Sequence, residues 1–324
     1  MVDSGQCLAC YLPLEEDEVL YHPGCARKVF GHKKPPELSY GYDELGELAQ
    51  RVIRSKVTVP GVQKKLSIHL GRGEGGVHRF TIVGLWGNFI LKPPTVDYPL
   101  MPEIEDLTMH LAEIFQIKTV PHCLIPLQTG ELSYLTSRVD RLPNGEKLLM
   151  EDMCQLTERL TEYKYHGSME QIGKVIKTYS SNPGFDSLAF FEMTLFTFLT
   201  GNADMHLKNF SLLYPVDGMV QLAPAYDMLA TRLILPEEVD PEEMALTVNG
   251  KKSRLKKRDF DQFAKTLGLT SIQVRNVMQR FGIALPQALS FVEKGLIPYE
   301  KQQELIRLME ERFERLSVEQ EMIK

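Results

Sequence analysis

Residues 200–214 read TGNADMHLKNFSLLY, and this stretch decides which fold the chain can adopt. It places Asp204, His206, Lys208 and Asn209 within six positions. One of the most apolar segments of the chain, LAFFEMTLFTFL, precedes it, and the stretch itself ends in the apolar run FSLLY. Polar groups between two buried elements must be hydrogen-bonded, bound to a ligand or exposed to a cleft. The stretch is therefore the first candidate for a functional site.

We expect the helix before this stretch to end at Gly201, because glycine commonly ends helices. On a continued helix Asp204 and Asn209 would point apart, since five positions turn the chain by ~140°. In a loop they can converge. A strand follows, and the Asp-Gly dipeptide at 217–218 is a strong hairpin signal. The return strand ends at PAYDML, so we expect Asp227 to lie at the same end of the hairpin as the loop.

An Asp and an Asn five positions apart on a loop, followed by a hairpin and a second Asp, is the arrangement of kinase catalytic loops. In that chemistry Asp204 orients an attacking hydroxyl and accepts its proton. Asn209 and Asp227 hold Mg²⁺ through hard oxygen ligands, and Mg²⁺ neutralises charge on the phosphoryl group. The alternative is an Asp204–Lys208 ion pair on a helix surface with an unrelated Asp227.

Phosphoryl transfer also needs a lysine on the nucleotide phosphates, and Lys92 at the end of the apolar run FIL is the candidate. A lysine at such a position must be paired if it is buried. Glu105 lies just off the apolar stripe of the next predicted helix, 102–115. We therefore expect a strand-to-helix ion pair, which is a kinase feature. The alternative is a strand-end lysine in solvent.

Two segments compete for the role of a phosphate-binding loop. Residues 71–76, GRGEGG, match G-x-G-x-x-G, but they lie between two strands that we expect to pair, so a hairpin turn explains them fully. Residues 58–65, TVPGVQKK, have one glycine and precede the first strand. In the expected strand order this loop lies at the same end as Lys92, and we favour it.

Four soft ligands lie near the N-terminus, in residues 7–25, with the spacing C-x2-C, eleven residues, H-x2-C. They are Cys7, Cys10, His22 and Cys25. Two close pairs separated by a short loop suit tetrahedral Zn²⁺. The alternative is a small cysteine-containing cap with reduced thiols and no metal. A reducing cytosol disfavours a disulfide, and the odd count of five cysteines argues against a full disulfide framework.

The composition is that of an ordinary globular chain of 324 residues, with 43% hydrophobic and 25% charged residues. A net charge of −6 gives no basic footprint for direct nucleic-acid binding. No apolar run approaches the ~20 residues that a membrane helix needs, and the N-terminus lacks a signal-peptide pattern. We therefore expect a cytoplasmic protein without a membrane partner.

Hydrophobic periodicity predicts a β-rich first half and a helical second half, which is α+β and not alternating βαβ. The expected strands are 65–70, 77–84, 88–93, 122–128 and 132–139, and the expected later helices are 169–179, 186–200, 259–267, 271–281 and 298–317. We predict three domains: a Cys/His segment at 1–35, a β-rich N-lobe at 36–148 and a helical C-lobe at 149–324.

Several of these segments together resemble the HipA-like serine/threonine kinases, toxins of bacterial toxin–antitoxin pairs. They are TVPGVQKKL, FILKPP, SRVDR, MEDMCQ, GNADMHLKNFSL and PAYDML, within roughly residues 45–260. The resemblance implies a two-lobed protein-kinase-like fold. It implies that Asp204 is the catalytic base and that Lys92 contacts phosphates. The other ATP·Mg²⁺ site residues that it implies are Pro60, Gly61, Val62, Gln63, Lys64, Lys65, a hinge of Glu151, Asp152 and Met153, and His206, Leu207, Lys208, Asn209, Tyr226 and Asp227.

The resemblance also implies a function and partners. It implies the toxin of a type II toxin–antitoxin system, an ATP-dependent kinase that phosphorylates a translation component such as an aminoacyl-tRNA synthetase, and also itself. The expected partner is a HipB-like DNA-binding antitoxin, a small HipS-like protein, or both. Only 57 residues precede Thr58, so the chain is similar to the short HipT-like form, whose missing subdomain is a separate small protein.

The chain departs from the family where a regulatory serine is often found beside the loop glycine. Thr58 and Pro60 stand at those places. We therefore expect Thr58 to be the main autophosphorylation site if the loop is modified. Two other functions stay open: a small-molecule kinase of related fold, and a non-catalytic regulator that binds ATP or DNA.

Overall fold

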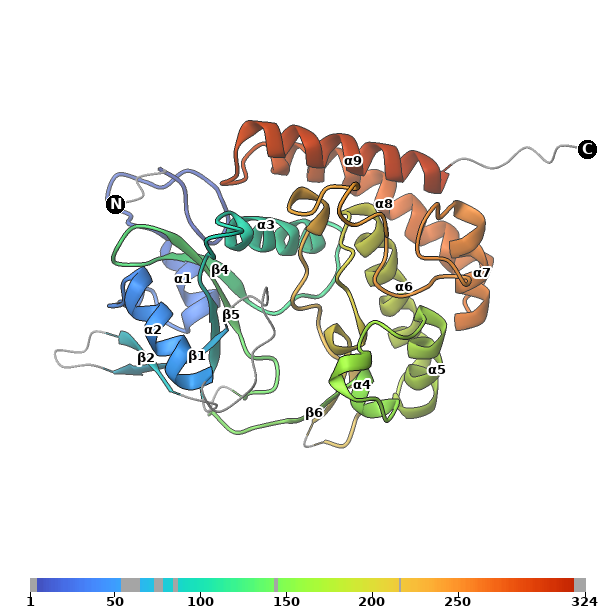
Figure 1. The fold of residues 1–324 in the computed structure, drawn as a ribbon, viewed down its shortest axis with the longest axis horizontal. Helices are drawn as coiled ribbons and strands as arrows, with labels where there is room; N and C mark the ends of the chain where they lie inside the picture. The colour runs from blue at the N-terminus through green and yellow to red at the C-terminus, as the bar shows by residue number, and fades with distance from the viewer. Residues whose placement is uncertain are drawn as a thin grey trace, which may run out of the picture. The chain divides into compact units, whose positions relative to one another are not determined.

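The computed structural model describes residues 5–53, 65–72, 78–83, 87–142, 145–215 and 217–317 (Figure 1). The chain forms two compact units, which are described separately below. Unit 1 comprises Met1–Leu107, Val120–Gly145 and Lys294–Ile297, and unit 2 comprises Thr108–Thr119, Glu146–Glu293 and Pro298–Lys324. The Cys/His segment that the sequence sets apart falls within unit 1.

The described part of unit 1 contains a five-stranded antiparallel sheet in the order β2-β1-β3-β5-β4. Its strands are β1 (Leu66–Arg72), β2 (His78–Ile82), β3 (Phe89–Lys92), β4 (His122–Pro126) and β5 (Leu132–Ser137). The central strand β3 is apolar, and Leu91 is fully buried. In the register Leu66 pairs with Leu91, while Arg72 pairs with His78. The start of β1 and the end of β3 therefore lie at the same end of the sheet, and the end of β1 and the start of β2 lie at the opposite end.

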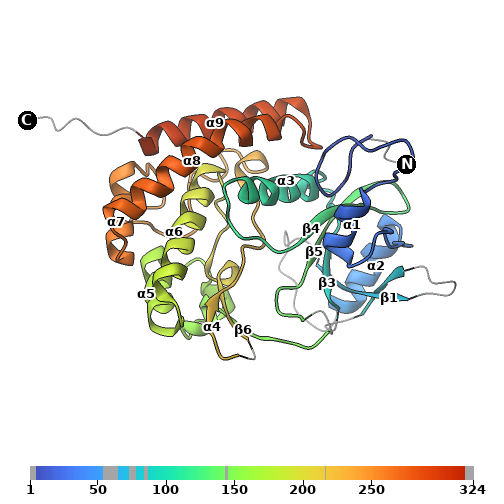
Figure 2. The ribbon, with the colours of Figure 1, turned by 180° about the vertical axis from the view of Figure 1, so that it is seen from behind.

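Unit 1 also contains the helices α1 (Pro23–Phe30) and α2 (Tyr42–Ile53) and the first part of α3 (Met101–Ile114) (Figures 1 and 2). The residues of α3 from Thr108 onward belong to unit 2. Helix α1 has Pro23 at its start and Gly31 in the left-handed conformation at its end, as helix boundaries favour. Its residue Phe30 contacts Phe80 of β2 edge to face, with ring centroids 6.2 Å apart. Almost every residue of α3 is buried, so this helix is a core element.

Unit 2 is mainly helical and is built around α6 (Pro183–Leu199). Residues 190–199 of α6 are buried without interruption, as expected for a helix enclosed on all sides. Phe190 contacts Phe263 of α7, and Phe198 contacts Phe260 of the same helix. The other helices are α4 (Met153–Leu156), α5 (Met169–Tyr179), α7 (Lys257–Leu267), α8 (Ser271–Val292) and α9 (Tyr299–Ser317), and Figure 2 shows α5, α7, α8 and α9 gathered around α6.

A small antiparallel sheet completes the described part of unit 2, with the order β6-β7-β8. Its strands are β6 (Leu149–Asp152), β7 (Ser211–Tyr214) and β8 (Gln221–Leu222). The pairing of Leu213 with Gln221 confirms the hairpin predicted across the Asp-Gly turn. The sequence patterns did not predict β6, α1 or α4, which are only four to eight residues long.

Helix α8 runs eleven residues beyond the predicted end at residue 281. Gly282 and Pro286 follow that point, and both residues disfavour a helix interior. The helix continues because Ala284, Ala288 and Val292 are buried, so tertiary packing overrides the local preference.

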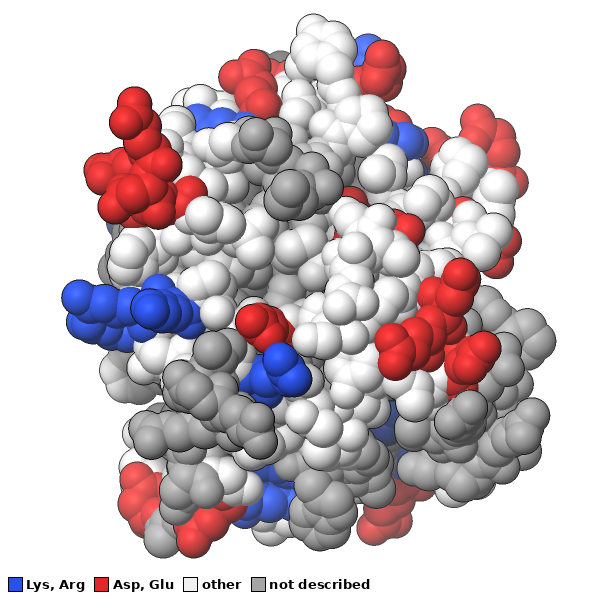
Figure 3. All heavy atoms as spheres, turned by 90° about the vertical axis from the view of Figure 1, so that its left-hand side faces the viewer, with Lys and Arg blue, Asp and Glu red and all other residues white. Residues whose placement is uncertain are grey.

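No helix within the described residues combines the length and the apolar character that a membrane crossing requires. On the face shown in Figure 3, the described acidic and basic side chains are dispersed over a largely uncharged surface. The described lysine and arginine side chains on this face do not form one extended patch.

Candidate functional site

The loop after α6 is held in place by hydrogen bonds to Thr231. Gly201 ends the helix in the left-handed conformation, with φ +70°. The Thr231 hydroxyl donates to the Gly201 carbonyl at 3.0 Å and accepts from the Ala203 amide at 2.7 Å. The amide of Asp204 then donates to the Asn202 side-chain oxygen at 3.1 Å. The loop that carries the polar cluster therefore leaves the helix in a fixed direction.

Asp204 is exposed, and its carboxylate accepts a hydrogen bond from a tyrosine. The Tyr165 hydroxyl donates to Asp204 Oδ1 at 2.6 Å. Partial burial and this hydrogen bond raise the pKa of Tyr165 above its ordinary value. The phenol therefore stays protonated and acts as a donor, which places a hydroxyl directly on the carboxylate predicted to be a catalytic base.

Asn209 and Asp227 lie in contact, as the hairpin argument predicts. Asn209 Nδ2 donates to Asp227 Oδ2 at 3.0 Å, and Asn209 Oδ1 accepts from the amide of His206 at 3.2 Å. Asp227 has a φ of +60°, which is uncommon for residues other than glycine and tolerated best by Asn and Asp. Backbone strain of this kind concentrates at functional sites. The loop and the hairpin therefore bring the side-chain amide of Asn209 and the carboxylate of Asp227 into contact.

His206 is a buried and neutral part of this cluster. Burial lowers its pKa to about 4, and the nearby carboxylates of Asp204 and Asp227 oppose that shift only in part. The ring contacts Tyr165 edge to face, with centroids 5.1 Å apart. Both aspartates act electrostatically on this one imidazole, so all three residues occupy one neighbourhood.

Lys208 connects the loop to the predicted hinge. Its Nζ lies 2.5 Å from Asp152 Oδ2, and Asp152 also caps α4 by accepting from the amide of Gln155. The Tyr226 hydroxyl donates to the carbonyl of Lys208 at 3.0 Å and is hydrogen-bonded to Ser211. The alternative reading, an Asp204–Lys208 pair, does not match these partners. Residues 151–153, 206–209 and 226–227 of the prediction are thus brought together in unit 2.

In unit 1, Lys92 and Glu105 form the expected strand-to-helix pair. Lys92 Nζ lies 2.5 Å from Glu105 Oε1, and the two side chains are only 3% and 1% exposed. The ammonium group also lies 5.4 Å from the ring centroid of Tyr134. Removing one partner of such a buried pair would leave an uncompensated charge, which costs about 3–5 kcal/mol. The predicted phosphate-contacting lysine is therefore buried and paired, and not a strand-end residue in solvent.

Arg72 pairs with His78, so the strands on either side of the glycine-rich segment are antiparallel neighbours, and residues 73–76 lie outside the described residues. The predicted phosphate-binding loop, residues 58–65, precedes β1. Its last residue, Lys65, is exposed at the end of the sheet where β3 ends. Thr58 and the predicted phosphate-contacting residues Pro60, Gly61, Val62, Gln63 and Lys64 lie outside the described residues.

Two features of the site had no signal in the sequence patterns. Tyr165 is 39 positions before Asp204, and nothing in its local sequence indicates this contact. Asp152 was expected only as a hinge residue, and its ion pair with Lys208 depends on the pairing of β6 with β7. Both contacts arise from tertiary structure.

A family model described as the HipA-like C-terminal domain matches residues 57–289, well over half of the chain. Two curated relatives come from Sinorhizobium fredii. "Putative kinase Y4dM" is 32% identical over 62% of this chain and 50% of its own length, and "Putative kinase Y4mE" is 29% identical over 66% and 51%. A "Putative kinase" of Haemophilus influenzae is 26% identical over 72% of this chain and 74% of its own. The chain thus spans about half the length of two of these relatives.

Two solved structures share the fold at low identity. HipA of Shewanella oneidensis, solved as a toxin–antitoxin complex with HipB and operator DNA, has a TM-score of 0.63 and 19% identity over 84% of this chain and 73% of its own. The Helicobacter pylori proinflammatory kinase CtkA has a TM-score of 0.51 and 16% identity over 70% and 86%. Together with the family match, this likeness confirms an α+β, two-lobed protein-kinase-like fold, and the chain belongs to the HipA-like C-terminal domain family.

Proposed function

We propose that the protein is an ATP-dependent kinase that transfers the γ-phosphoryl group to a serine or threonine hydroxyl of another protein. The observation that carries this proposal is the contact between Asn209 and Asp227, on the loop-and-hairpin unit that also carries Asp204. Membership of the HipA-like family and the kinase-like fold support the same reaction class.

The donor set fits a hard divalent cation. Asp227 supplies a carboxylate, and Asn209 supplies an amide oxygen that accepts only one amide hydrogen bond among the described contacts. A carbonyl oxygen has two lone pairs, so Oδ1 can serve the His206 amide and a metal ion together. We propose that these two residues hold Mg²⁺, which prefers carboxylate and carbonyl oxygens. When bound, Mg²⁺ supplies charge neutralisation at the nucleotide phosphates.

Asp204 is proposed as the base. Its exposed carboxylate already accepts a hydroxyl hydrogen bond from Tyr165. A substrate hydroxyl in the same relation to Asp204 would be oriented for attack and would give its proton to the carboxylate. His206, whose pKa burial lowers to about 4, adds no positive charge beside this carboxylate at neutral pH.

Within unit 1, Lys92, held by Glu105, is proposed as a phosphate-contacting residue together with residues 60–65. Residues 151–153 would face adenine, because β6 is an edge strand of its described sheet and one row of its backbone groups lies outside the ladder. His206, Leu207, Lys208 and Tyr226 would complete the nucleotide site, and Thr58 is the proposed autophosphorylation site.

We propose a biological role for this chain from its likeness to the Shewanella oneidensis HipA. That HipA is described as part of a toxin–antitoxin system and was solved with HipB and operator DNA. We propose that this chain is likewise the toxin of a type II pair, with a HipB-like antitoxin, a HipS-like protein, or both as partners. A translation component, such as an aminoacyl-tRNA synthetase, is the proposed substrate class. Contact with DNA would then be made by the antitoxin, in keeping with the net charge of −6.

The test is phosphoryl transfer from γ-labelled ATP to proteins of a cell lysate. Wild type should label at least one protein band on serine or threonine, and Asp204→Ala should not. Asp217→Ala is a matched control, because Asp217 is an exposed turn residue of the same hairpin. Label found only in small molecules would favour a small-molecule kinase, and no transfer with wild type would contradict the proposal.

A further inference from the structure

The four soft ligands of the N-terminal segment converge in unit 1. One sulfur or ring nitrogen from each of Cys7, Cys10, His22 and Cys25 lies within 4.8 Å of all the others. The Cys10 sulfur is 3.3 Å from His22 Nδ1, and the Cys25 sulfur is 3.8 Å from the same nitrogen. Zn–S bonds of ~2.3 Å and Zn–N bonds of ~2.0 Å place tetrahedral ligand atoms about 3.5–3.8 Å apart. The cluster therefore has the dimensions of a zinc site.

The backbone around the first pair is shaped for metal binding. The amides of Cys10 and Tyr11 both donate to the carbonyl of Cys7, at 3.3 and 2.8 Å, which folds the C-x2-C segment into a tight turn. Tyr11 completes the turn in the left-handed conformation, with φ +61°. The amide of His22 donates to the sulfur of Cys7 at 3.4 Å, a contact that favours a thiolate. These contacts fix the positions of the sulfurs and leave the sulfurs able to bind a metal ion.

The histidine is oriented by a second contact on its other nitrogen. His22 Nε2 lies 3.0 Å from the carbonyl of Pro13, so this nitrogen carries the proton and donates it. Nδ1 is then the unprotonated nitrogen that faces the sulfurs. Ligand histidines typically donate their second ring nitrogen to a carbonyl or carboxylate in this manner. The tautomer that the surroundings select is therefore the one that a metal requires.

The chemistry of the set selects the metal. Three thiolates and one imidazole form a closed Cys₃His set, which is typical of structural zinc and leaves no position for a substrate. All three cysteines are free thiols, so no disulfide competes for the sulfurs.

We propose that Cys7, Cys10, His22 and Cys25 bind one structural Zn²⁺, which fixes the N-terminal segment against β4 and α3. The amide of Leu124 donates to the carbonyl of Leu8 at 2.9 Å, so the segment covers the edge strand β4. Zinc binding thereby closes a sheet edge that would otherwise expose unpaired backbone groups.

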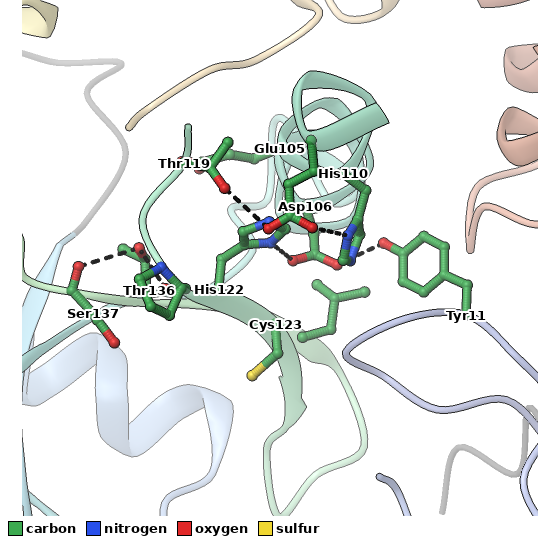
Figure 4. A network of polar contacts seen from close by, with 12 residues as sticks. Tyr11, Glu105, Asp106, His110, Thr119, His122, Cys123, Thr136 and Ser137 are labelled. Atoms are coloured by element: carbon green, nitrogen blue, oxygen red, sulfur yellow. Dashed lines mark hydrogen bonds and ion pairs between the residues drawn. The ribbon is translucent and has the colours of Figure 1, made fainter. Parts of the chain in front are cut away.

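The same segment reaches α3 through Tyr11, as Figure 4 shows. The Tyr11 hydroxyl donates to Asp106 Oδ2 at 2.7 Å, and His122 of β4 lies 2.7 Å from the other oxygen of the same carboxylate. Asp106 and Tyr11 are both fully buried. Asp106 directly follows Glu105, the partner of Lys92. The zinc-held turn therefore supports the part of α3 that positions this buried ion pair.

The zinc site is tested by metal analysis of the full chain purified without chelator. Wild type should contain one zinc per chain, and Cys10→Ser should contain almost none. Cys154→Ser is the matched control, because Cys154 is a buried thiol outside the cluster, and it should keep the zinc. Folded wild type free of zinc, or full zinc content in Cys10→Ser, would overturn the proposal.

A second measurement covers the case in which Cys10→Ser does not fold. Removing the metal from wild type with a strong chelator should make three thiols newly reactive to an alkylating reagent, and mass spectrometry should map them to Cys7, Cys10 and Cys25. Equal reactivity of these thiols before and after chelation would contradict zinc ligation.

The support of α3 is tested by hydrogen exchange, which does not depend on kinase activity. Chelation should speed amide exchange in α3 and β4. Tyr11→Phe should keep the zinc yet speed exchange in α3, because only the hydrogen bond to Asp106 is lost. Unchanged exchange in α3 after both treatments would overturn the proposed support while leaving the proposed enzymatic function untouched.

Discussion

The Tyr165 hydroxyl donates to the Asp204 carboxylate at 2.6 Å, which is the place that a substrate hydroxyl would take if Asp204 is the proposed base. If the proposed base is correct, this contact must break before a substrate hydroxyl can bind. Tyr165→Phe removes the competing donor and keeps the ring contact with His206. We expect a lower KM for the protein substrate, by about threefold or more, with ATP affinity unchanged.

Steady-state kinetics at saturating ATP measures this effect, and calorimetry measures ATP affinity. Tyr163→Phe is a suitable control, since Tyr163 is an exposed neighbour outside this contact. A KM for Tyr165→Phe that is equal to or above that of wild type would show that the tyrosine does not compete with substrate.

Glu103 in the first turn of α3 is a buried carboxyl with an unusual pKa. Burial is the largest cause and raises its pKa to about 7, and the nearby carboxylate of Asp106 adds to the shift. The folded protein therefore binds more protons than the unfolded chain between about pH 4.5 and 7. The free energy of unfolding should fall as pH rises through this window, and this group should account for a loss of about 3 kcal/mol at pH 8.

Glu103→Gln should abolish that loss, because glutamine stays neutral at every pH. Chemical denaturation at pH 5 and pH 8 should show the variant gaining stability over wild type at pH 8 only. Glu44→Gln, at an exposed position of α2, should leave the pH dependence unchanged. An unfolding free energy of Glu103→Gln that follows wild type at both pH values would contradict the assignment.

At the scale of elements, the end of α6 sets the position of the Asp204 loop. A Cβ at Gly201 would lie 2.6 Å from Leu308 Cδ2 and 2.9 Å from Arg232 Cβ, and φ is +70°. Gly201→Ala should therefore lower the free energy of unfolding by about 1–2 kcal/mol for the left-handed backbone, and further for the displaced contacts.

Gly218→Ala is the matched control for this change. Gly218 also has a positive φ, of +77°, but a Cβ there meets nothing within 4 Å. Thermal or chemical unfolding should show a clearly larger loss for Gly201→Ala than for Gly218→Ala. Equal losses would mean that packing at the end of α6 does not constrain the loop.

The elements that sequence predicts well are those with strong local signals. The hairpin of β7 and β8 follows from the Asp-Gly turn, and the pair of Lys92 with Glu105 follows from a lysine after an apolar run. The strand β6 is short, and its pairing with β7, far along the chain, defines it. The contact of Tyr165 with Asp204 also depends on tertiary structure, so no local pattern could predict it.

At the scale of the whole molecule, the chain divides into a unit with the five-stranded sheet and a mainly helical unit. Unit 1 contains the buried Lys92–Glu105 pair, and unit 2 contains Asp204, Asn209 and Asp227. The sequence predicted the division into a β-rich and a helical part, because periodicity changes near residue 150. It could not predict the extension of α8 past Pro286, where burial outweighs local preference.

In the proposed mechanism, Asn209 and Asp227 hold the metal ion of a nucleotide complex while Asp204 acts only in transfer. Isothermal titration calorimetry of ATP with and without Mg²⁺ tests it most directly. Asp227→Ala should weaken Mg²⁺-dependent ATP binding at least tenfold, or about 1.4 kcal/mol, and Asp204→Ala should bind ATP·Mg²⁺ as wild type does. If Asp227→Ala binds ATP·Mg²⁺ as tightly as wild type, the metal assignment and the kinase mechanism built on it are wrong.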